Sequence, residues 1–422
     1  MDRSLQAVVA GTFTLRFSTG LTGALLLYYL AELPRYGGEP VGAALVGLFG
    51  AIFFVAELVL SPLFGVLSDR LGWRPVMQIG PLFGAVAVVM TGLSTSLPVL
   101  ASTRLLEGAS AAASVPSILG YIALATAADE GLRGRAVARF EAATLAGLGI
   151  GLVVAGPLYR VLGPLGFFVN AGVYGVSLLI YRFGVDPEDP MPRDAPRRGI
   201  DLGRYGRLLR ASAVWLLAPS WIAFNAVVGV WTSQSIFQLV REPKPGFEDQ
   251  LLMGGFGPIE VSIGLAVWLV IFFAGIFYWG TRFKKLRRTT IIFFGAPGGI
   301  AMVGAIYLLN HSAGQPLAAQ AAYAVAGSAG LFVLAGATPA AIGLLADISE
   351  SHPADRGLIM GLYSVFLAVG QIVGALLGGG AAELFGVDGL LGVTTGLLLV
   401  ALLPLSRLRA VEHRVGEASA QA

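Results

Sequence analysis

Residues 65–75 have the sequence Gly-Val-Leu-Ser-Asp-Arg-Leu-Gly-Trp-Arg-Pro, a short charged stretch punctuated by two glycines. Long apolar runs flank it, at residues 41–64 and 76–95. At ~1.5 Å per residue, each run is long enough to cross a bilayer as a helix. The stretch therefore predicts a tight polar turn that joins two membrane-spanning helices.

The composition agrees with a membrane protein. Of the 422 residues, 56% are hydrophobic and only 13% are charged, whereas soluble domains carry about 25% charged residues. The net charge of +3 is small and does not suggest nucleic-acid binding. The chain has no cysteine, which excludes disulfides, thiolate catalysis and cysteine metal sites. The first apolar run shows no small-residue cleavage site, so we expect a retained first helix rather than a signal peptide.

Further apolar runs continue along the chain, and together they predict an all-α membrane protein with twelve spanning helices. The expected spans are residues 7–31, 41–64, 76–95, 98–126, 141–162, 166–183, 212–240, 258–279, 290–309, 316–346, 357–381 and 386–406. An even number of spans places both termini on the same side. One set of loops, with the two tails, carries 22 Lys and Arg, and the opposite loops carry 4. The positive-inside rule thus predicts that both termini and the 65–75 turn face the cytoplasm.

The stretch between the sixth and seventh runs is proline-rich and charged, which is typical of a linker. We therefore expect a six-helix bundle over residues 1–183, a cytoplasmic linker over 184–211, a second bundle over 212–407 and a tail over 408–422. Residues 200–210 alternate Arg with Leu and Tyr. They fit either an amphipathic helix on anionic lipid or a plain solvated linker.

The two halves contain an internal repeat: the second half aligns with the first at one constant shift, without gaps. In this register Pro116 falls on Pro339, and the pair Arg133-Gly134 falls on Arg356-Gly357. The same register pairs Gly147, Gly151 and Gly156 with Gly370, Gly374 and Gly379. We infer two pseudo-symmetric bundles around a central cavity, the construction that secondary transporters use for alternating access.

Three motifs resemble signatures of the major facilitator superfamily. The first is its loop signature, Gly-x-x-x-Asp-(Arg/Lys)-x-Gly-x-(Arg/Lys), matched by Gly65, Asp69, Arg70, Gly72 and Arg74. Trp73 stands where the family often has a second basic residue. The second is the helix-4 signature, an Arg followed four residues later by Gly, matched by Arg104 and Gly108. The third is the helix-5 signature typical of the family's exporters. Its fit is loose, because the Gly-Pro pair comes later than usual, and the matching residues are Gly147, Gly151, Gly156 and Pro157.

Asp69 lies at a cytoplasmic helix end, where it can pair with a cation or with the positive N-terminus of a helix. Arg356, at the start of the eleventh span, is the candidate partner. Such a contact would form a cytoplasmic gate. The alternative is a turn whose charges only set the topology.

Charges within the spans need a partner or a task, because burying a charge in a bilayer is costly. Arg16 and Glu57 have matched depths on the first two spans, and Arg104 and Glu107 lie on one face of the fourth. These four residues are either structural ion pairs or a network in which a carboxylate takes and releases a proton. A variant of the second hypothesis keeps the arginines free for an anionic substrate.

The seventh span mixes amide, hydroxyl and indole side chains, and we expect part of it to line a substrate cavity. The candidate lining residues are Arg16, Trp221, Asn225, Gln234, Gln238 and, on the eleventh span, Gln371. Aromatic and amide groups suit an amphipathic or neutral solute.

The sequence therefore predicts a secondary transporter of the cytoplasmic membrane, with proton-coupled export of amphipathic compounds as its activity. One alternative is uptake or exchange of a small organic anion, and another, of a different class, is a non-transporting scaffold or receptor. We expect no enzyme activity, cofactor or metal. The expected partners are a small-molecule substrate, protons and the lipid bilayer, with no nucleic acid, and we expect a monomer.

Overall fold

The computed structural model describes residues 3–127, 129–186, 214–243, 245–350, 356–410 and 412. Within these residues the regular structure is helical throughout, with no β-strand. This agrees with a chain in a bilayer, where a helix satisfies its own backbone hydrogen bonds. The first part of the chain forms α1 (Arg3–Ala31), η1 (Leu33–Tyr36), α2 (Ala43–Leu71), α3 (Trp73–Leu93), α4 (Leu97–Ala125), α5 (Glu130–Leu162), η2 (Gly163–Leu165) and α6 (Gly166–Gly184). The second part forms α8 (Val214–Val240), α9 (Pro258–Gly280), η3 (Thr281–Lys284), α10 (Arg288–Asn310), α11 (Leu317–Leu334), α12 (Ala337–Glu350) and α13 (Arg356–Leu402).

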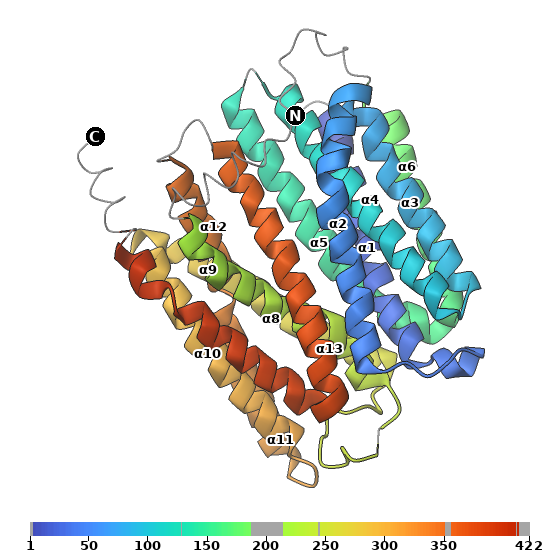
Figure 1. The fold of residues 1–422 in the computed structure, drawn as a ribbon, viewed down its shortest axis with the longest axis vertical. Coiled ribbons are helices and arrows are strands. Elements are labelled where there is room, and N and C mark those ends of the chain that lie inside the picture. Colours follow the sequence, from blue (N-terminus) through green and yellow to red (C-terminus); the bar gives the residue numbers. More distant parts are fainter. Residues whose placement is uncertain are drawn as a thin grey trace. The chain divides into compact units, whose positions relative to one another are not determined.

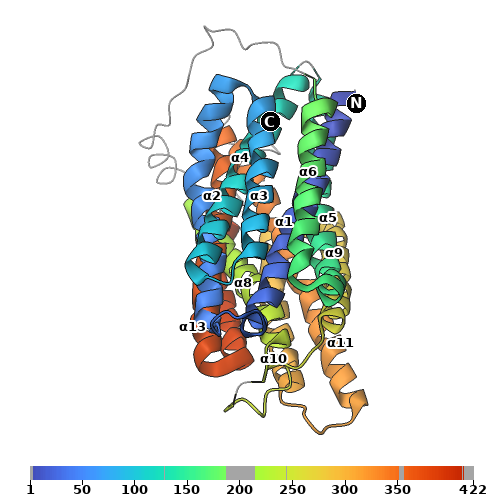
Figure 2. The same cartoon turned by 90° about the vertical axis from the view of Figure 1, so that its right-hand side faces the viewer.

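The described residues separate into two compact units. The first unit comprises those of Met1–Val41, Phe49–Gly199 and Phe256–Ala266, and the second those of Gly42–Leu48, Ile200–Gly255 and Val267–Ala422. In the first unit, α1 packs against α5 and α6, and α3 packs against α4 and α6 (Figures 1 and 2). In the second, α8 runs along α13, and α10 contacts α11, α12 and α13 (Figure 1).

The charged stretch of residues 65–75 is mostly helix rather than the loop that the sequence predicts. Here α2 continues to Leu71, and α3 starts at Trp73. The helix is broken at Gly72, with φ +91°, a left-handed value that favours glycine. The second glycine of the loop signature therefore has a conformational role. Directly after it, the Trp73 indole packs against Gly120 of α4, where a Cβ would lie 2.5 Å from the Trp73 Nε1.

One expected span is divided in the structure: residues 316–346 form α11 and α12. The expected spans 357–381 and 386–406 correspond to the two helical parts of α13, which meet at a kink. Gly386, with φ 63° and ψ −141°, marks the one non-helical position inside α13. The intervening Glu383 stays in the helix and accepts a hydrogen bond from the Ala44 backbone N–H (3.4 Å).

Nine stretches of the described residues are long and apolar enough to cross a membrane. Two of them, Gly131–Gly184 and Ser364–Ala410, are 54 and 47 residues long. A single crossing needs only about 20 residues. Helix α1 is not among the nine stretches. The chain is thus a multi-pass membrane protein. The amphipathic helix considered for residues 200–210 lies outside the described residues, as does the end of the tail.

Candidate functional site

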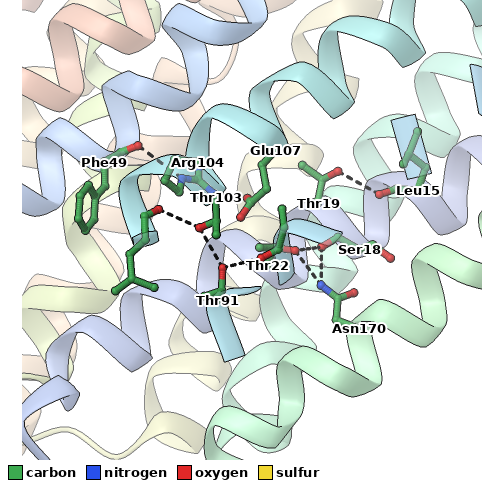
Figure 3. Close-up of polar contacts among 12 residues, drawn as sticks. Leu15, Ser18, Thr19, Thr22, Phe49, Thr91, Thr103, Arg104, Glu107 and Asn170 are labelled. Carbon is green, nitrogen blue, oxygen red and sulfur yellow. Dashed lines mark hydrogen bonds and ion pairs between the residues drawn. The ribbon is translucent and has the colours of Figure 1, made fainter. Parts of the chain in front are cut away.

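Arg104 and Glu107 form a buried ion pair on α4. Their i, i+3 spacing puts both side chains on one face of the helix, and the two residues are only 8% and 3% exposed. The Arg104 Nε also donates to the carbonyl oxygen of Phe49 (3.4 Å), and its guanidinium lies 4.9 Å from the centre of the Phe53 ring. Helix α2 can approach this closely because residue 108 is glycine, where a Cβ would overlap the Phe53 carbonyl oxygen. The structure therefore brings these two predicted residues together (Figure 3).

One carboxylate oxygen of Glu107 has no hydrogen-bond partner. Arg104 contacts Oε2, whereas Oε1 is buried without a partner among the described residues. Leaving a charged oxygen unpaired inside a membrane protein is unfavourable, so such a group is a candidate for binding a proton. This orphaned oxygen distinguishes Glu107 from a purely structural ion-pair residue.

A cluster of small polar side chains from α1, α3, α4 and α6 lies beside this pair (Figure 3). Asn170 of α6 is fully buried, and its Nδ2 donates to the Ser18 carbonyl oxygen (3.1 Å) and to the Thr22 Oγ1 (2.7 Å). The hydroxyl of Thr91 donates to that of Thr103 (3.0 Å). The cluster was not predicted from the sequence. Its signal is the accumulation of Ser, Thr and Asn in otherwise apolar spans.

Arg16 is half-buried on α1, and its charge acts on two carboxylates. One belongs to Glu57 of α2, for which the sequence predicts an ion pair with Arg16, and the other to Glu141 of α5. Arg16 forms no ion pair within 4.0 Å in the part of the chain that the structure describes. Glu141 was not predicted, because hydropathy makes it the first residue of a span. Helix α5 instead begins at Glu130, which places Glu141 well inside the helix.

The glycines of the helix-5 signature allow close approach of neighbouring backbones. A Cβ on Gly147 would lie 2.7 Å from the Phe13 carbonyl oxygen, and one on Gly151 would overlap the Phe17 carbonyl oxygen, both on α1. A Cβ on Gly156 would overlap the carbonyl oxygen of Pro258, the first residue of α9. Pro157 lies inside α5. In this chain the signature therefore builds helix contacts.

The second unit repeats these contacts with different side chains. A Cβ on Gly370 would meet the carbonyl oxygen of Ile222, the Cβ of Asn225 and the amide of Ala226, all on α8. A Cβ on Gly147 would meet the corresponding atoms of α1, namely the carbonyl oxygen of Phe13, the Cβ of Arg16 and the amide of Phe17. These three residues have the same spacing along α1 as the other three have along α8. Asn225 is therefore the counterpart of Arg16. The first unit carries a charge at this position, and the second carries an amide.

The candidate cavity residues on α8 are engaged within the second unit. Trp221 packs in the apolar core of the second unit, and its carbonyl oxygen accepts from the Asn225 side chain (2.8 Å). The Gln234 Nε2 donates to the Ala43 carbonyl oxygen (3.0 Å), and the Gln238 Nε2 donates to the Gln234 Oε1 (3.0 Å). Gln371, on α13, accepts from the Thr232 hydroxyl (3.4 Å). Gln234 and Gln238 thus form a chain along α8.

In the loop signature, Asp69 and Arg70 are exposed at the end of α2, and nothing lies within 4 Å of a Cβ built on Gly65. Arg74 turns to α6, where its Nη2 donates to the Arg182 carbonyl oxygen (2.5 Å) in the last helical turn. A cation at this end of a helix is favourable. The side chain of the expected gate partner, Arg356, lies outside the described part of the structure.

Among the described residues there is no cluster of three or more His, Asp or Glu side chains able to hold a metal ion. The ionisable groups described above in the first unit are carboxylates and arginines. Groups of this kind, inside membrane-spanning helices, are typical of transport proteins.

The model of the Major Facilitator Superfamily matches residues 8–338, so the chain belongs to this superfamily. It is 26% identical over 352 residues to Multidrug resistance protein 1 of Bacillus subtilis (strain 168), a match that covers 81% of each chain. It is 28% identical over 123 residues to Quinolone resistance protein NorA of Staphylococcus aureus, or 29% of this chain and 30% of the relative.

Solved structures of similar fold include the nucleoside transporter NupG, with a TM-score of 0.70 and 15% identity over 97% of this chain and 99% of that one. A bacterial homolog to the human lysosomal transporter Spinster also has a TM-score of 0.70, with 13% identity over 98% of both chains. At these identities the likeness concerns the fold. Family and fold together indicate a multi-pass membrane transporter of small molecules rather than an enzyme.

Proposed function

We propose that the protein is a proton-coupled exporter of amphipathic compounds in the cytoplasmic membrane, working by alternating access. The observation that carries the coupling is the buried Glu107, whose Oε2 pairs with Arg104 and whose Oε1 has no partner among the described residues. Support for export comes from the relative named as a multidrug resistance protein, which matches 81% of the chain.

Twelve spans in two six-helix bundles, with residues 184–211 as the linker, are part of this proposal. The two longest apolar stretches each contain a glycine of positive φ, Gly163 and Gly386, and each is long enough for two crossings. The nine apolar stretches give twelve spans when each of these two is counted as two crossings and α1 is added. The charge bias of the loops supports termini on the cytoplasmic side.

In the proposed cycle, Glu107 exchanges its proton as the transporter alternates. When Glu107 is ionised, Arg104 neutralises it through Oε2. When Glu107 is protonated, the pair carries one net positive charge, which disfavours a cationic substrate nearby. Binding of proton and substrate is thereby made competitive, the requirement for exchanging one against the other.

The test is Glu107→Gln in proteoliposomes, with a fluorescent amphipathic cation as substrate. We expect accumulation driven by a pH gradient to fall at least tenfold. Counterflow of this cation should fall as well, because the amide, like the protonated carboxyl, leaves the Arg104 charge uncompensated. Counterflow of a neutral amphipathic compound should remain within about twofold of wild type, because Gln can still accept from Arg104. The matched control is Glu39→Gln, which removes an exposed carboxylate. If Glu107→Gln keeps its gradient-driven accumulation, proton coupling through Glu107 is wrong.

A second candidate function is uptake or exchange of a small organic anion. It is favoured by one observation: Arg16 has no ion pair among the described residues and remains available for an anion. The negative charges of Glu57 and Glu141, which interact with Arg16, disfavour the binding of an anion there. Counterflow by organic anions but not by cations, lost in Arg16→Gln, would support this alternative. A non-transporting scaffold would show no counterflow with either class.

A further inference from the structure

In the second unit, a histidine lies between two aspartates where three segments meet. His311 follows the last residue of α10, Asp249 lies in the connection between α8 and α9, and Asp388 lies just after the break in α13. The His311 Nε2 is 2.8 Å from the Asp388 Oδ2, and its Nδ1 is 3.3 Å from the Asp249 Oδ2. We call these three residues the His311 clasp.

Both ring nitrogens of His311 thus face carboxylate oxygens. A neutral imidazole has only one N–H, so its second nitrogen would present a lone pair to a carboxylate. The imidazolium has two N–H groups and satisfies both partners. Among the described residues, Tyr307 of α10 also contacts His311, with the two ring centres 4.6 Å apart. Only the doubly protonated ring can donate to both carboxylates in this geometry.

Hydrogen bonds next to the clasp join the same three segments. The Asp388 Oδ1 accepts from the Asn310 Nδ2 (2.9 Å), while the Asn310 backbone oxygen and Oδ1 accept from the amides of Leu251 (2.7 Å) and Leu252 (3.0 Å). The adjoining Gln250 accepts from the Val387 amide (2.8 Å). Residues 249–252 are therefore tied to the end of α10 and to α13 beside Gly386, where its helix is interrupted.

We propose that His311 is a regulatory proton-binding site that fastens residues 249–252 to α10 and α13 when it is charged. An imidazole changes charge between about pH 5 and 8, so acid closes the clasp and alkaline conditions loosen it. That this end of the unit faces the outside, where an exporter of this kind takes up its protons, rests on the proposed function. The response of the His311 clasp to pH is independent of the proposed function.

The test is amide hydrogen exchange on the full chain in lipid nanodiscs, without substrate or gradient. At each pH, the exchange rate of the Leu251 and Leu252 amides in His311→Gln is divided by that of wild type, so the intrinsic pH dependence of exchange cancels. We expect a ratio of about ten at pH 5.5 and below two at pH 8.5. Equal ratios at both pH values, or no difference at pH 5.5, would overturn the proposal.

Two further variants keep the outcome interpretable. Asp249→Asn alters a side chain that is 69% exposed and leaves the hydrogen bonds of Gln250 and Asn310 in place, so it should fold normally. It should raise exchange about threefold at pH 5.5 and not at pH 8.5. The control is His413→Gln, since the chain has only three histidines. Because no transport is measured, a failure here is distinct from a failure of proton coupling at Glu107.

Discussion

Glu107 and Arg16 are both charged residues within spans, but their surroundings differ. Arg104 neutralises Glu107 at contact distance, whereas Arg16 lies near two carboxylates without contacting either. The first arrangement is fixed by i, i+3 spacing on one helix. The second is assembled from three helices, α1, α2 and α5. Only the second therefore depends on how the bundle packs.

The sequence was sufficient to find Arg104 and Glu107 as neighbours, because both lie on one helix face. It also placed Arg16 near Glu57, from matched depth on adjacent spans. It did not identify Glu141 as a residue inside a helix, because the first residues of α5 are polar and hydropathy placed the start of the span too late. Nor did it find the orphaned Oε1 of Glu107, since hydrogen bonding in three dimensions cannot be deduced from spacing.

At the residue scale, the two carboxylates near Arg16 should substitute for each other. We expect Glu57→Gln and Glu141→Gln each to lower the melting temperature by only a few degrees, because one carboxylate still offsets the arginine. The double variant leaves a half-buried charge without compensation, for which a cost of about 3–5 kcal/mol is typical in buried sites. Thermal unfolding of the four proteins measures this. Strictly additive effects would contradict it.

At the scale of elements, the pairing of α1 with α5 and of α8 with α13 depends on glycines that bring backbones together. Gly151 meets Phe17 in the first unit, and Gly374 meets Ala226 in the second. The repeat was visible in the sequence for the spans that contain these glycines, since glycines and an Arg-Gly pair recur there in register. The matching register between α1 and α8 was not visible, because those helices share few residue identities.

Gly151→Leu and Gly374→Leu should therefore destabilise the protein to a similar extent. Forcing extra side-chain volume into a packed contact costs typically about 1–3 kcal/mol. Here the obstacle is a backbone carbonyl that cannot move aside. Gly172→Leu on α6 is the control, because nothing lies within 4 Å of a Cβ at that position. Thermal unfolding in detergent compares the three. A Gly151→Leu protein as stable as Gly172→Leu would refute the expectation.

The helix boundaries could not be read correctly from hydropathy. Polar residues 65–71 stay helical in α2, and Glu383 stays in α13, since each backbone still makes its own hydrogen bonds. The helical conformation is interrupted at a glycine with positive φ, Gly72 in one case and Gly386 in the other. In both cases the break falls at a glycine within a few residues of the boundary that hydropathy predicts.

At the scale of the whole molecule, we propose that Asp69 helps to keep the cytoplasmic side closed. Because the chain has no cysteine, the single substitution Thr14→Cys reports access from that side. Adding Asp69→Asn should increase its labelling by a membrane-impermeant thiol reagent several-fold, since the helix end loses its negative charge. Glu39→Gln, which alters an exposed acid elsewhere, should not. Unchanged labelling with Asp69→Asn would leave residues 65–75 with only a topological role.

The most direct test of proton-coupled export follows the protons themselves. Proteoliposomes containing a trapped pH-sensitive dye receive an outward gradient of an amphipathic cation, with no initial pH gradient. We expect the lumen to acidify as substrate leaves the vesicles through wild-type protein. The Glu107→Gln protein, in which the Arg104 charge stays uncompensated, should show neither efflux of the cation nor this acidification. Substrate efflux through wild-type protein with no change in lumenal pH would contradict proton-coupled export.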